Sequence, residues 1–349
     1  ILSIATFTLS MCGTFLVRSG ILNSVHTFAN DPKRGLFILI FLFCLIFLSL
    51  FIFIFFHNVV EKSIRNFFWL SKETSILINN WFMMYFLTVV LIGTVYPIFL
   101  EVLSSEKISV GPPFYHKLIV PLLIPFLFAM TVGPKLNWIK SDLKNKKYLI
   151  LFLMISFLLS VLIIKNLDIK FLINTILVAS ALYLFFITLR DFFVKGLKNI
   201  SQNIAHFGFS LLILSILFNN IFSSELITNL KVGESFKNEK FEIIFNDLKK
   251  FKQKNFMSFK GNFSIIENEI KEELEPELRV YNQPNIITSE ADIKTTFLSD
   301  KFITMNTVKN EEYFNIRYQV KPFMLWIWIS VLLISLGGTV SLFRRNYEK

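Results

Sequence analysis

Four histidines are the side chains in this sequence best suited to chemistry, and each stands beside or inside an apolar stretch: His26, His57, His116 and His206. A neutral imidazole nitrogen binds metal ions, haem iron among them. His26 lies in FLVRSGILNSVHTFANDPKRG (15–35), between Arg18 and the pair Lys33 and Arg34. These cations could pair with anionic groups on a bound molecule, and haem propionates fit that description. A plain polar loop residue is the alternative interpretation.

His206 lies about one turn into a long apolar run, in SQNIAHFGFSLLILSILF (201–218). An unpaired imidazole inside a bilayer is costly, so this residue is either a metal ligand or hydrogen-bonded to a neighbouring helix. The small Gly208 would let a flat macrocycle approach the helix. His57 and His116 lie at the ends of apolar runs, where an ordinary solvated role is favoured. Two histidines at opposite membrane depths cannot bind one metal, so His26 and His206 imply two sites.

The composition predicts an α-helical polytopic membrane protein. Among 349 residues, 54% are hydrophobic and 42 are Phe, and the mean hydropathy is +0.57, which is far above that of a soluble domain. Because a bilayer core needs roughly 20 apolar residues per helix, we expect about eight transmembrane helices. They fall near residues 1–17, 36–56, 79–100, 117–134, 148–164, 171–189, 204–222 and 323–343. The sequence opens inside a hydrophobic run without a charged start, which predicts the C-terminal part of a longer protein.

The net charge of +11 belongs to the short loops, because segment 223–321 holds 15 Lys and Arg against 16 Asp and Glu. A basic surface for nucleic acid is therefore not indicated. Loops after alternate spans carry 14 basic residues and the intervening loops carry 7. By the positive-inside rule the richer set is cytoplasmic. This places His26 and the segment 223–320 on the outer side of the membrane.

A small β-rich domain outside the membrane is predicted over residues 223–320. There the pattern changes to period-two alternation with β-branched residues, typical of about six to eight short strands. Residues 1–222 form the transmembrane region, with an outer loop over 18–35, and residues 321–349 form the last transmembrane helix and a short cytoplasmic tail. We also expect an extended, rigid ledge at Pro112-Pro113 and a helix stop at Gly133-Pro134.

Other chemistry is not indicated. Cys12 and Cys44 both lie in apolar runs, where we expect small buried hydrophobic residues. The sequence has no Gly-rich phosphate loop, no zinc-type spacing of Cys and His and no supported Ser-His-Asp order. The acidic run ENEIKEELEPE (267–277) is interpreted as a solvated face or turn.

The segment GTFLVRSGILNSVHTFANDPKRGLFIL (13–39) closely resembles the signature of the CcmF family, the haem lyase subunit of cytochrome c maturation. The resemblance covers nearly the whole chain in the right order. It continues through SKETSILINN (71–80), GTVYPIFL (93–100), KISVGPPFY (107–115), IAHFG (204–208), LEPELRVY (274–281), TSEADI (288–293) and VKPFMLWIWISVLLISLGG (320–338).

This resemblance implies a protein of the bacterial, or of the mitochondrial, inner membrane that attaches haem to apocytochrome c. It implies a CcmE-like haem chaperone, CcmH-like and CcmI-like thiol-handling subunits, and quinol as partners. His26 matches the family's second periplasmic histidine, an axial ligand of the incoming haem, with Arg18 and Arg34 beside it. His206 matches the second transmembrane histidine, a ligand of a separate haem b. The family's tryptophan-rich WWD segment and its two other histidines are absent from this sequence.

Two alternatives from other classes remain: a multispan transporter of haem or a small anion, and a non-catalytic assembly subunit. A transporter predicts polar groups near the mid-bilayer and discontinuous helices. The runs 36–56, 148–164 and 171–189 are instead almost unbroken Phe, Leu and Ile. The sequence therefore favours the haem lyase subunit, with His26 and His206 as its two haem ligands.

Overall fold

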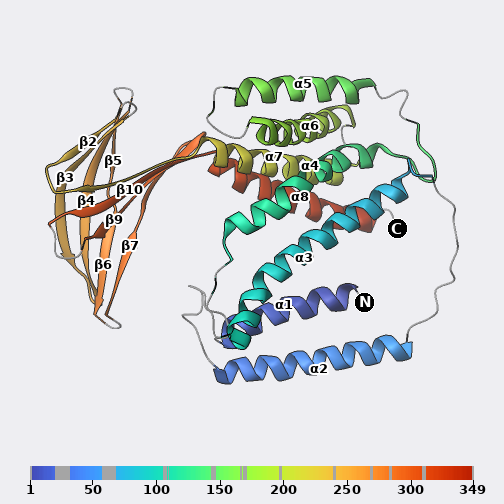
Figure 1. Cartoon of the computed structure of the whole chain (residues 1–349), viewed down its shortest axis with the longest axis horizontal. Helices are drawn as coiled ribbons and strands as arrows, with labels where there is room; N and C mark the ends of the chain where they lie inside the picture. Colours follow the sequence, from blue (N-terminus) through green and yellow to red (C-terminus); the bar gives the residue numbers. More distant parts are fainter. Residues whose placement is uncertain are drawn as a thin grey trace. The chain divides into compact units, whose positions relative to one another are not determined.

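The computed structural model contains eight α-helices and ten β-strands in the part of the chain that it describes (Figure 1). The chain consists of two compact units, Ile1–Asp142 and Leu143–Lys349. The described residues are 2–19, 32–56, 68–104, 108, 110–142, 147–165, 167, 171–195, 199–238, 241–267, 270–282, 285–308 and 312–347.

The first unit consists of two helix pairs, in which α1 packs on α2 and α3 packs on α4. Tyr85 joins the second pair, because its hydroxyl donates to the Leu118 carbonyl at 3.1 Å. The rings of Phe82 and Phe126 also meet edge to face. The helices are α1 (Leu2–Ser19), α2 (Pro32–Phe56), α3 (Lys72–Ser104) and α4 (Pro112–Val132), followed by the 3-10 turn η2 (Gly133–Lys135).

The start of α3 is tied to the segment that follows α4. Both carboxylate oxygens of Glu73 accept from the Ile139 N–H, at 3.1 and 3.0 Å, and Ile139 has a left-handed backbone with φ of 66°. Gly133 lies so close to Ser75 that a Cβ there would come within 2.1 Å of the Ser75 Oγ. The predicted helix stop at Gly133-Pro134 is confirmed, because α4 ends at Val132. The glycine also allows the close approach of α3.

The prediction of an extended ledge at Pro112-Pro113 is wrong. Both prolines occupy the first turn of α4, and Gly111 before them is extended, with φ −100° and ψ −179°. Proline suits this place because the first helical N–H groups have no partner within the helix and its fixed φ is already helical. The expectation that both cysteines are buried is also wrong, since Cys12 is half-buried and Cys44 is exposed on α2.

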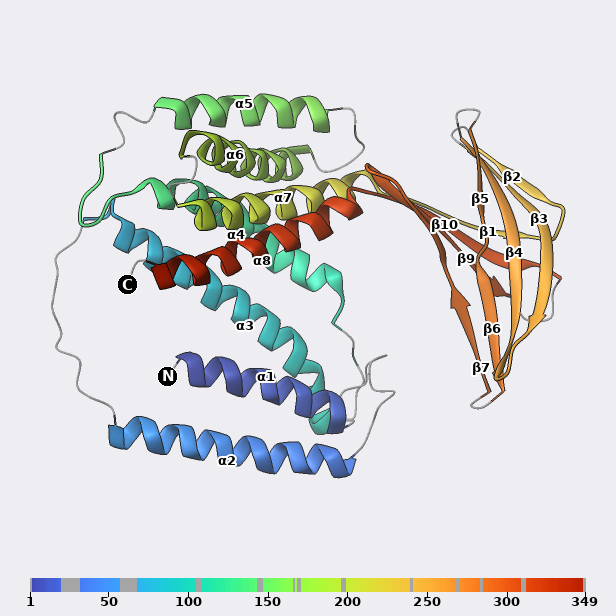
Figure 2. The same cartoon turned by 180° about the vertical axis from the view of Figure 1, so that it is seen from behind.

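The helices of the second unit pack in the order α5, α6, α7 and α8 (Figure 2). They are α5 (Lys147–Ile164), α6 (Phe171–Lys195), α7 (Ile200–Phe222) and α8 (Met324–Tyr347). Of the described helices, α2 to α8 are long and apolar enough to cross a membrane, whereas the apolar part of α1, Ile4–Ser19, is shorter. The eighth predicted span therefore stays a prediction.

The contact between α7 and α8 is built from small residues. A Cβ on Gly337 would lie 2.7 Å from the Ala205 backbone nitrogen and 2.8 Å from the Ser201 carbonyl oxygen. A Cβ on Gly208 would lie 3.0 Å from the Ser330 carbonyl oxygen. Helices approach this closely where side chains are absent, as at the small-residue contacts of membrane proteins.

The β domain is a sandwich of two antiparallel sheets. One has the order β1-β10-β9-β8 and the other β2-β3-β4-β6-β7, with β5 also paired to β4. The strands are β1 (Ser224–Leu230), β2 (Ser235–Lys237), β3 (Phe241–Lys252), β4 (Phe256–Glu267), β5 (Ile270–Leu274), β6 (Glu277–Asn282), β7 (Asn285–Glu290), β8 (Asp292–Thr295), β9 (Ser299–Thr307) and β10 (Phe314–Pro322).

The described residues hold more strands than the six to eight predicted, because short or charged strands such as β2 and β5 lack an apolar alternation. The core between the sheets contains stacked Phe245 and Phe263, whose ring centroids are 4.3 Å apart, together with Ile303 and Tyr318. At the joint with the helices, the Trp326 indole N–H donates to the Phe297 carbonyl at 3.0 Å.

Replacing Gly337 by alanine should force α7 and α8 apart, because the new Cβ would meet backbone atoms that cannot move aside. We expect a loss of about 1–3 kcal/mol in the free energy of unfolding, the usual cost of overpacking. Thermal unfolding in detergent, followed by the helical circular-dichroism signal, measures it.

Gly338→Ala is the matched control, since no atom lies within 4 Å of its added Cβ. It should be neutral or slightly stabilising, because alanine favours a helix over glycine. Equal losses for the two variants would contradict the small-residue contact.

Candidate functional site

His206 lies on α7, inside a helix of membrane-spanning length, and its side chain is half-buried. Phe209 and Ile213 follow on the same side of the helix at one and two turns, and both are also half-buried. The contacts of α7 with its neighbours use other positions. Phe207 meets Phe185 and Phe192 of α6, and Ala205 meets α8. One imidazole beside an apolar helix face suits a flat, apolar macrocycle with a metal at its centre.

Gly208 does not serve this face, so the suggestion that it admits a macrocycle is wrong. A residue advances about 100° around a helix, so Gly208 and His206 lie about 200° apart. The space beside Gly208 is filled by Leu333 and Ser330 of α8. The glycine in IAHFG therefore belongs to the helix contact, and the histidine belongs to the opposite side of α7.

A pair of hydroxyl groups connects α6 and α7 next to His206. Thr188 Oγ1 and Ser210 Oγ are 2.7 Å apart, and both side chains are buried. Each hydroxyl also lies within hydrogen-bond distance of a carbonyl of its own helix, Leu184 for Thr188 and Phe207 for Ser210. Because a hydroxyl has one hydrogen, one of the two donates to the other and the second donates to its own helix. This contact, which we call the hydroxyl pair, marks the register of the two antiparallel helices about one turn from the histidine.

The cations that flank His26 in the sequence are brought to one end of the α1–α2 pair. Arg18 is in the last turn of α1, and Lys33 and Arg34 are in the first turn of α2. A Cβ on Gly35 would lie 3.0 Å from the Ser19 Cα, so the two helix ends are in direct contact. Lys33 and Arg34 are exposed and Arg18 is half-buried. His26 itself lies outside the described residues.

The other two histidines gain no ligand partners from the structure. His116 is exposed in the second turn of α4, and His57 lies outside the described residues. Within the described ranges, no group of three or more His, Cys, Asp or Glu could hold a metal ion. His206 therefore stands as a single protein ligand in the part of the chain that is described.

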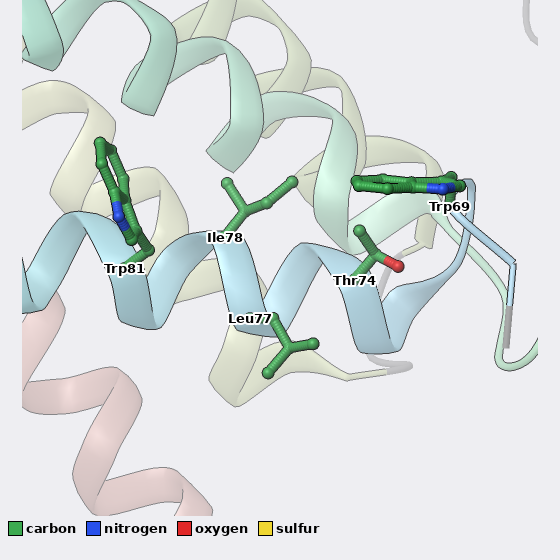
Figure 3. A pocket seen from close by; sticks show the side chains of 5 residues that line it. All are labelled: Trp69, Thr74, Leu77, Ile78 and Trp81. Atoms are coloured by element: carbon green, nitrogen blue, oxygen red, sulfur yellow. The ribbon is translucent and has the colours of Figure 1, made fainter. Parts of the chain in front are cut away.

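A pocket of about 370 Å³ lies at the start of α3, lined by Trp69, Thr74, Leu77, Ile78 and Trp81 (Figure 3). Its lining is mostly apolar, and both indole rings are largely exposed. Trp and Tyr favour the boundary between membrane and water. The pocket carries no titratable side chain and is a surface for apolar contact.

Of the two interpretations of the acidic run 267–277, the solvated face fits its described residues, because Glu273 and Glu275 are exposed and the run forms ion pairs along strands. Glu267 and Glu272 both lie within 3.1 Å of the Lys301 ammonium, at 2.6 and 3.1 Å. The Arg279 guanidinium lies 2.7 Å from Glu277, and the hydrogen bond from Arg279 lowers the pKa of Glu277, with a further contribution from Ser258. These charges stabilise the sandwich and are not arranged to bind a metal.

Known proteins resemble this chain along its whole length. Residues 221–322 match the family described as CcmF C-terminal beta-sandwich. A cytochrome c-type biogenesis protein CcmF of Pseudomonas fluorescens is 34% identical over 369 residues, which cover 100% of this chain and 55% of that protein. A protein of the same name from Escherichia coli (strain K12) is 30% identical over 359 residues, with coverage of 100% and 55%. The resemblance found in the sequence motifs is thereby confirmed.

A solved structure named Cytochrome c Heme Lyase CcmF has the same fold. Its TM-score is 0.67 at 20% sequence identity, covering 96% of this chain and 53% of that chain. The predicted fold class, membrane helices with a β domain before the last helix, is confirmed. The chain spans about half the length of the curated relatives that it matches.

Glu277→Gln should flatten the pH dependence of β-domain stability. The folded pKa of Glu277 lies below its value in the unfolded chain, so its contribution is present above the unfolded pKa and is lost as the pH falls through the folded pKa. We expect the wild type to lose up to about 1 kcal/mol more than the variant between near-neutral and acidic pH. Calorimetric melting temperatures of the two proteins across this range test it.

Glu273→Gln is the control, because the Glu273–Lys271 pair is more than half exposed on both sides and solvent screens it. This variant should keep the wild-type pH profile. A Glu277→Gln profile as steep as that of the wild type would refute the assignment.

Proposed function

Because this chain matches CcmF proteins along its whole length and its β domain matches the CcmF C-terminal beta-sandwich, we propose that it belongs to this family and forms the C-terminal part of a haem lyase of c-type cytochrome maturation. The observation that carries the proposal is the match of the whole chain to proteins named for cytochrome c-type biogenesis. In this role it binds haem at the outer membrane face and positions it for covalent attachment to apocytochrome c. The host membrane is the bacterial inner membrane or its mitochondrial counterpart.

His26 is proposed to bind the iron of the incoming haem, which is the substrate. Arg18 and Arg34 flank the loop from two helix ends that are in contact, and their positive charge suits the two propionates. The cations would hold the edge of the macrocycle while the imidazole holds its centre. Fixing the substrate at three points is the positional contribution that this chain makes to catalysis.

Thioether formation needs no nucleophilic side chain from this chain. Each thiol of the apocytochrome's Cys-x-x-Cys-His segment adds across one haem vinyl group. Its sulfur bonds to one carbon and its hydrogen goes to the other, so nothing leaves and no net oxidation occurs. The two cysteines of this chain, Cys12 and Cys44, lie on apolar helices and take no part. A haem chaperone and thiol-handling subunits are the proposed partners on the outer side.

His206 is proposed to be the residue of this chain that would hold the iron of a resident haem b. When bound, that haem supplies one-electron transfer, with quinol as the proposed source. The chain holds the imidazole at a fixed depth through the register of α6 and α7. The half-buried Phe209 and Ile213 provide an apolar surface beside it and limit the access of water.

Three buried hydroxyls of α5 and α6 give little support to a transporter. Ser156, Ser160 and Ser180 each donate to a carbonyl three or four residues earlier in the same helix, at 2.7 to 2.8 Å. Polar groups satisfied by their own backbone are not available to a substrate. Both α5 and α6 are also continuous, whereas transporter sites commonly use broken helices.

His26→Ala in the full-length protein should reduce c-type cytochrome formation by more than about tenfold, since even groups that merely orient a metal ligand cost that much. Haem-stained cytochrome in membranes of a complemented deletion strain measures it. His57→Ala, predicted to lie on the cytoplasmic side, is the control and should leave the yield unchanged. Unimpaired cytochrome formation in His26→Ala would favour the assembly-subunit alternative.

His206→Ala should remove the haem b absorbance of the purified full-length protein, because loss of an axial ligand leaves the iron held from one side alone. Reduced-minus-oxidised spectra normalised to protein report the haem content. The exposed His116→Ala is the matched control and should retain full absorbance. Wild-type haem content in His206→Ala would disprove the ligand assignment.

A further inference from the structure

Asp191 of α6 is the one charged residue that is buried in the described part of the chain, with 7% of its surface exposed. A buried carboxylate is costly unless it has cationic or hydrogen-bonding partners. The Arg190 Nη1 lies 3.5 Å from the Asp191 Oδ1. However, the Arg190 guanidinium is also held over the Tyr148 ring, 3.8 Å from its centroid. Arg190 is thus shared between Asp191 and Tyr148. The ion pair with Arg190 alone does not explain why the Asp191 carboxylate is buried.

The register of α6 and α7 places Asp191 level with His206. The hydroxyl pair, Thr188 and Ser210, marks one level of the two antiparallel helices. Asp191 is three residues beyond Thr188 on α6, and His206 is four residues before Ser210 on α7. Because the helices are antiparallel, both residues are displaced from the hydroxyl pair toward the end where α6 leads into α7. At 1.5 Å per residue these displacements are about 4.5 and 6 Å. The two side chains therefore differ in depth by about 1.5 Å.

The two residues also lie on the same side of the helix pair. Each residue rotates about 100° around a helix. Counted from Thr188 around α6, Phe185 and Phe192 lie to one side and Asp191 lies to the other side. On α7, Phe207 lies to one side of the hydroxyl pair and His206 lies to the other. The rings of Phe185 and Phe192 meet the ring of Phe207, at 5.6 and 6.1 Å between centroids. Since the aromatic residues share one side, the carboxylate and the imidazole share the opposite side.

We propose that Asp191 accepts a hydrogen bond from the His206 imidazole and so fixes which ring nitrogen faces the haem iron. The inference rests on the proposed function of His206. A carboxylate has two oxygens and about four acceptor sites, so an ion pair with Arg190 and a bond from His206 are compatible. A ligating histidine commonly donates its other N–H to a carboxylate, which orients the ring and strengthens it as a donor to the metal. Asp191 is in this sense a positioning residue.

The test compares Asp191→Asn with the wild type in the purified full-length protein with its haem b. An amide accepts a weaker hydrogen bond than a carboxylate, so the imidazole becomes a poorer donor and the ferric state is less stabilised. We expect a higher midpoint potential, an altered low-spin ferric electron paramagnetic resonance spectrum, and a haem affinity lowered by about ten- to hundredfold.

Thr188→Val is the matched control. It removes the hydroxyl contact one turn away on the same helix pair but leaves the carboxylate in place. It should keep the wild-type potential and spectrum. A shift as large as that of Asp191→Asn would mean that helix packing is responsible, and the proposal would be overturned.

His206→Ala distinguishes a failure of the proposed role of Asp191 from a failure of the proposed role of His206. If it abolishes the haem b signal while Asp191→Asn matches the wild type in potential and spectrum, the proposed ligand stands and the role of Asp191 is refuted. If His206→Ala retains the haem, the proposed function of His206 has failed instead.

Asp191→Glu keeps the experiment decisive if the asparagine variant does not accumulate. Its carboxylate is retained but lies one methylene further from the helix. The proposed contact predicts that haem is retained with a shifted potential, because the donor–acceptor geometry has changed. An unchanged potential and spectrum in this variant would also overturn the proposal.

Discussion

The close approach of α7 and α8 is the constraint on which the second unit depends. Gly208 and Gly337 remove the side chains that would keep the helices apart. These two helices lead into and out of the β domain, whose first and last strands, β1 and β10, are hydrogen-bonded neighbours. Strands pair at roughly 4.8 Å, whereas packed helices usually lie 8–10 Å apart. The small-residue contact lies several turns from the point where the helices become strands, and it holds the two helices close within their helical part.

The same contact decides which side of α7 is available for chemistry. With one side of the helix against α8 and another against α6, the imidazole of His206 is left beside Phe209 and Ile213 on a third side. The hydroxyl pair between α6 and α7 marks the level near which that imidazole lies. Packing between helices thus determines the position of His206.

Long apolar runs predicted the helices well, because the thickness of a bilayer leaves few other structures for twenty apolar residues. The details that failed depend on contacts between elements. Pro112 and Pro113 begin α4, and the glycine beside His206 faces α8. The burial of Asp191 could not be predicted, because the apolar run ends at residue 189 whereas α6 continues to Lys195 and buries the carboxylate. His26 was predicted from its sequence motif. It lies outside the described residues, whereas the cations that flank it, Arg18, Lys33 and Arg34, are described.

The joint at Trp326 has a mechanical consequence. The indole N–H binds the Phe297 carbonyl, and the Phe323 N–H binds the Leu298 carbonyl at 2.7 Å. Asn219 at the end of α7 donates to the Pro322 carbonyl at 2.6 Å. A domain hung from a single flexible tether can swivel freely. Here two strands and three bridging hydrogen bonds resist twisting, so a rotation of the sandwich is transmitted into the α7 and α8 pair.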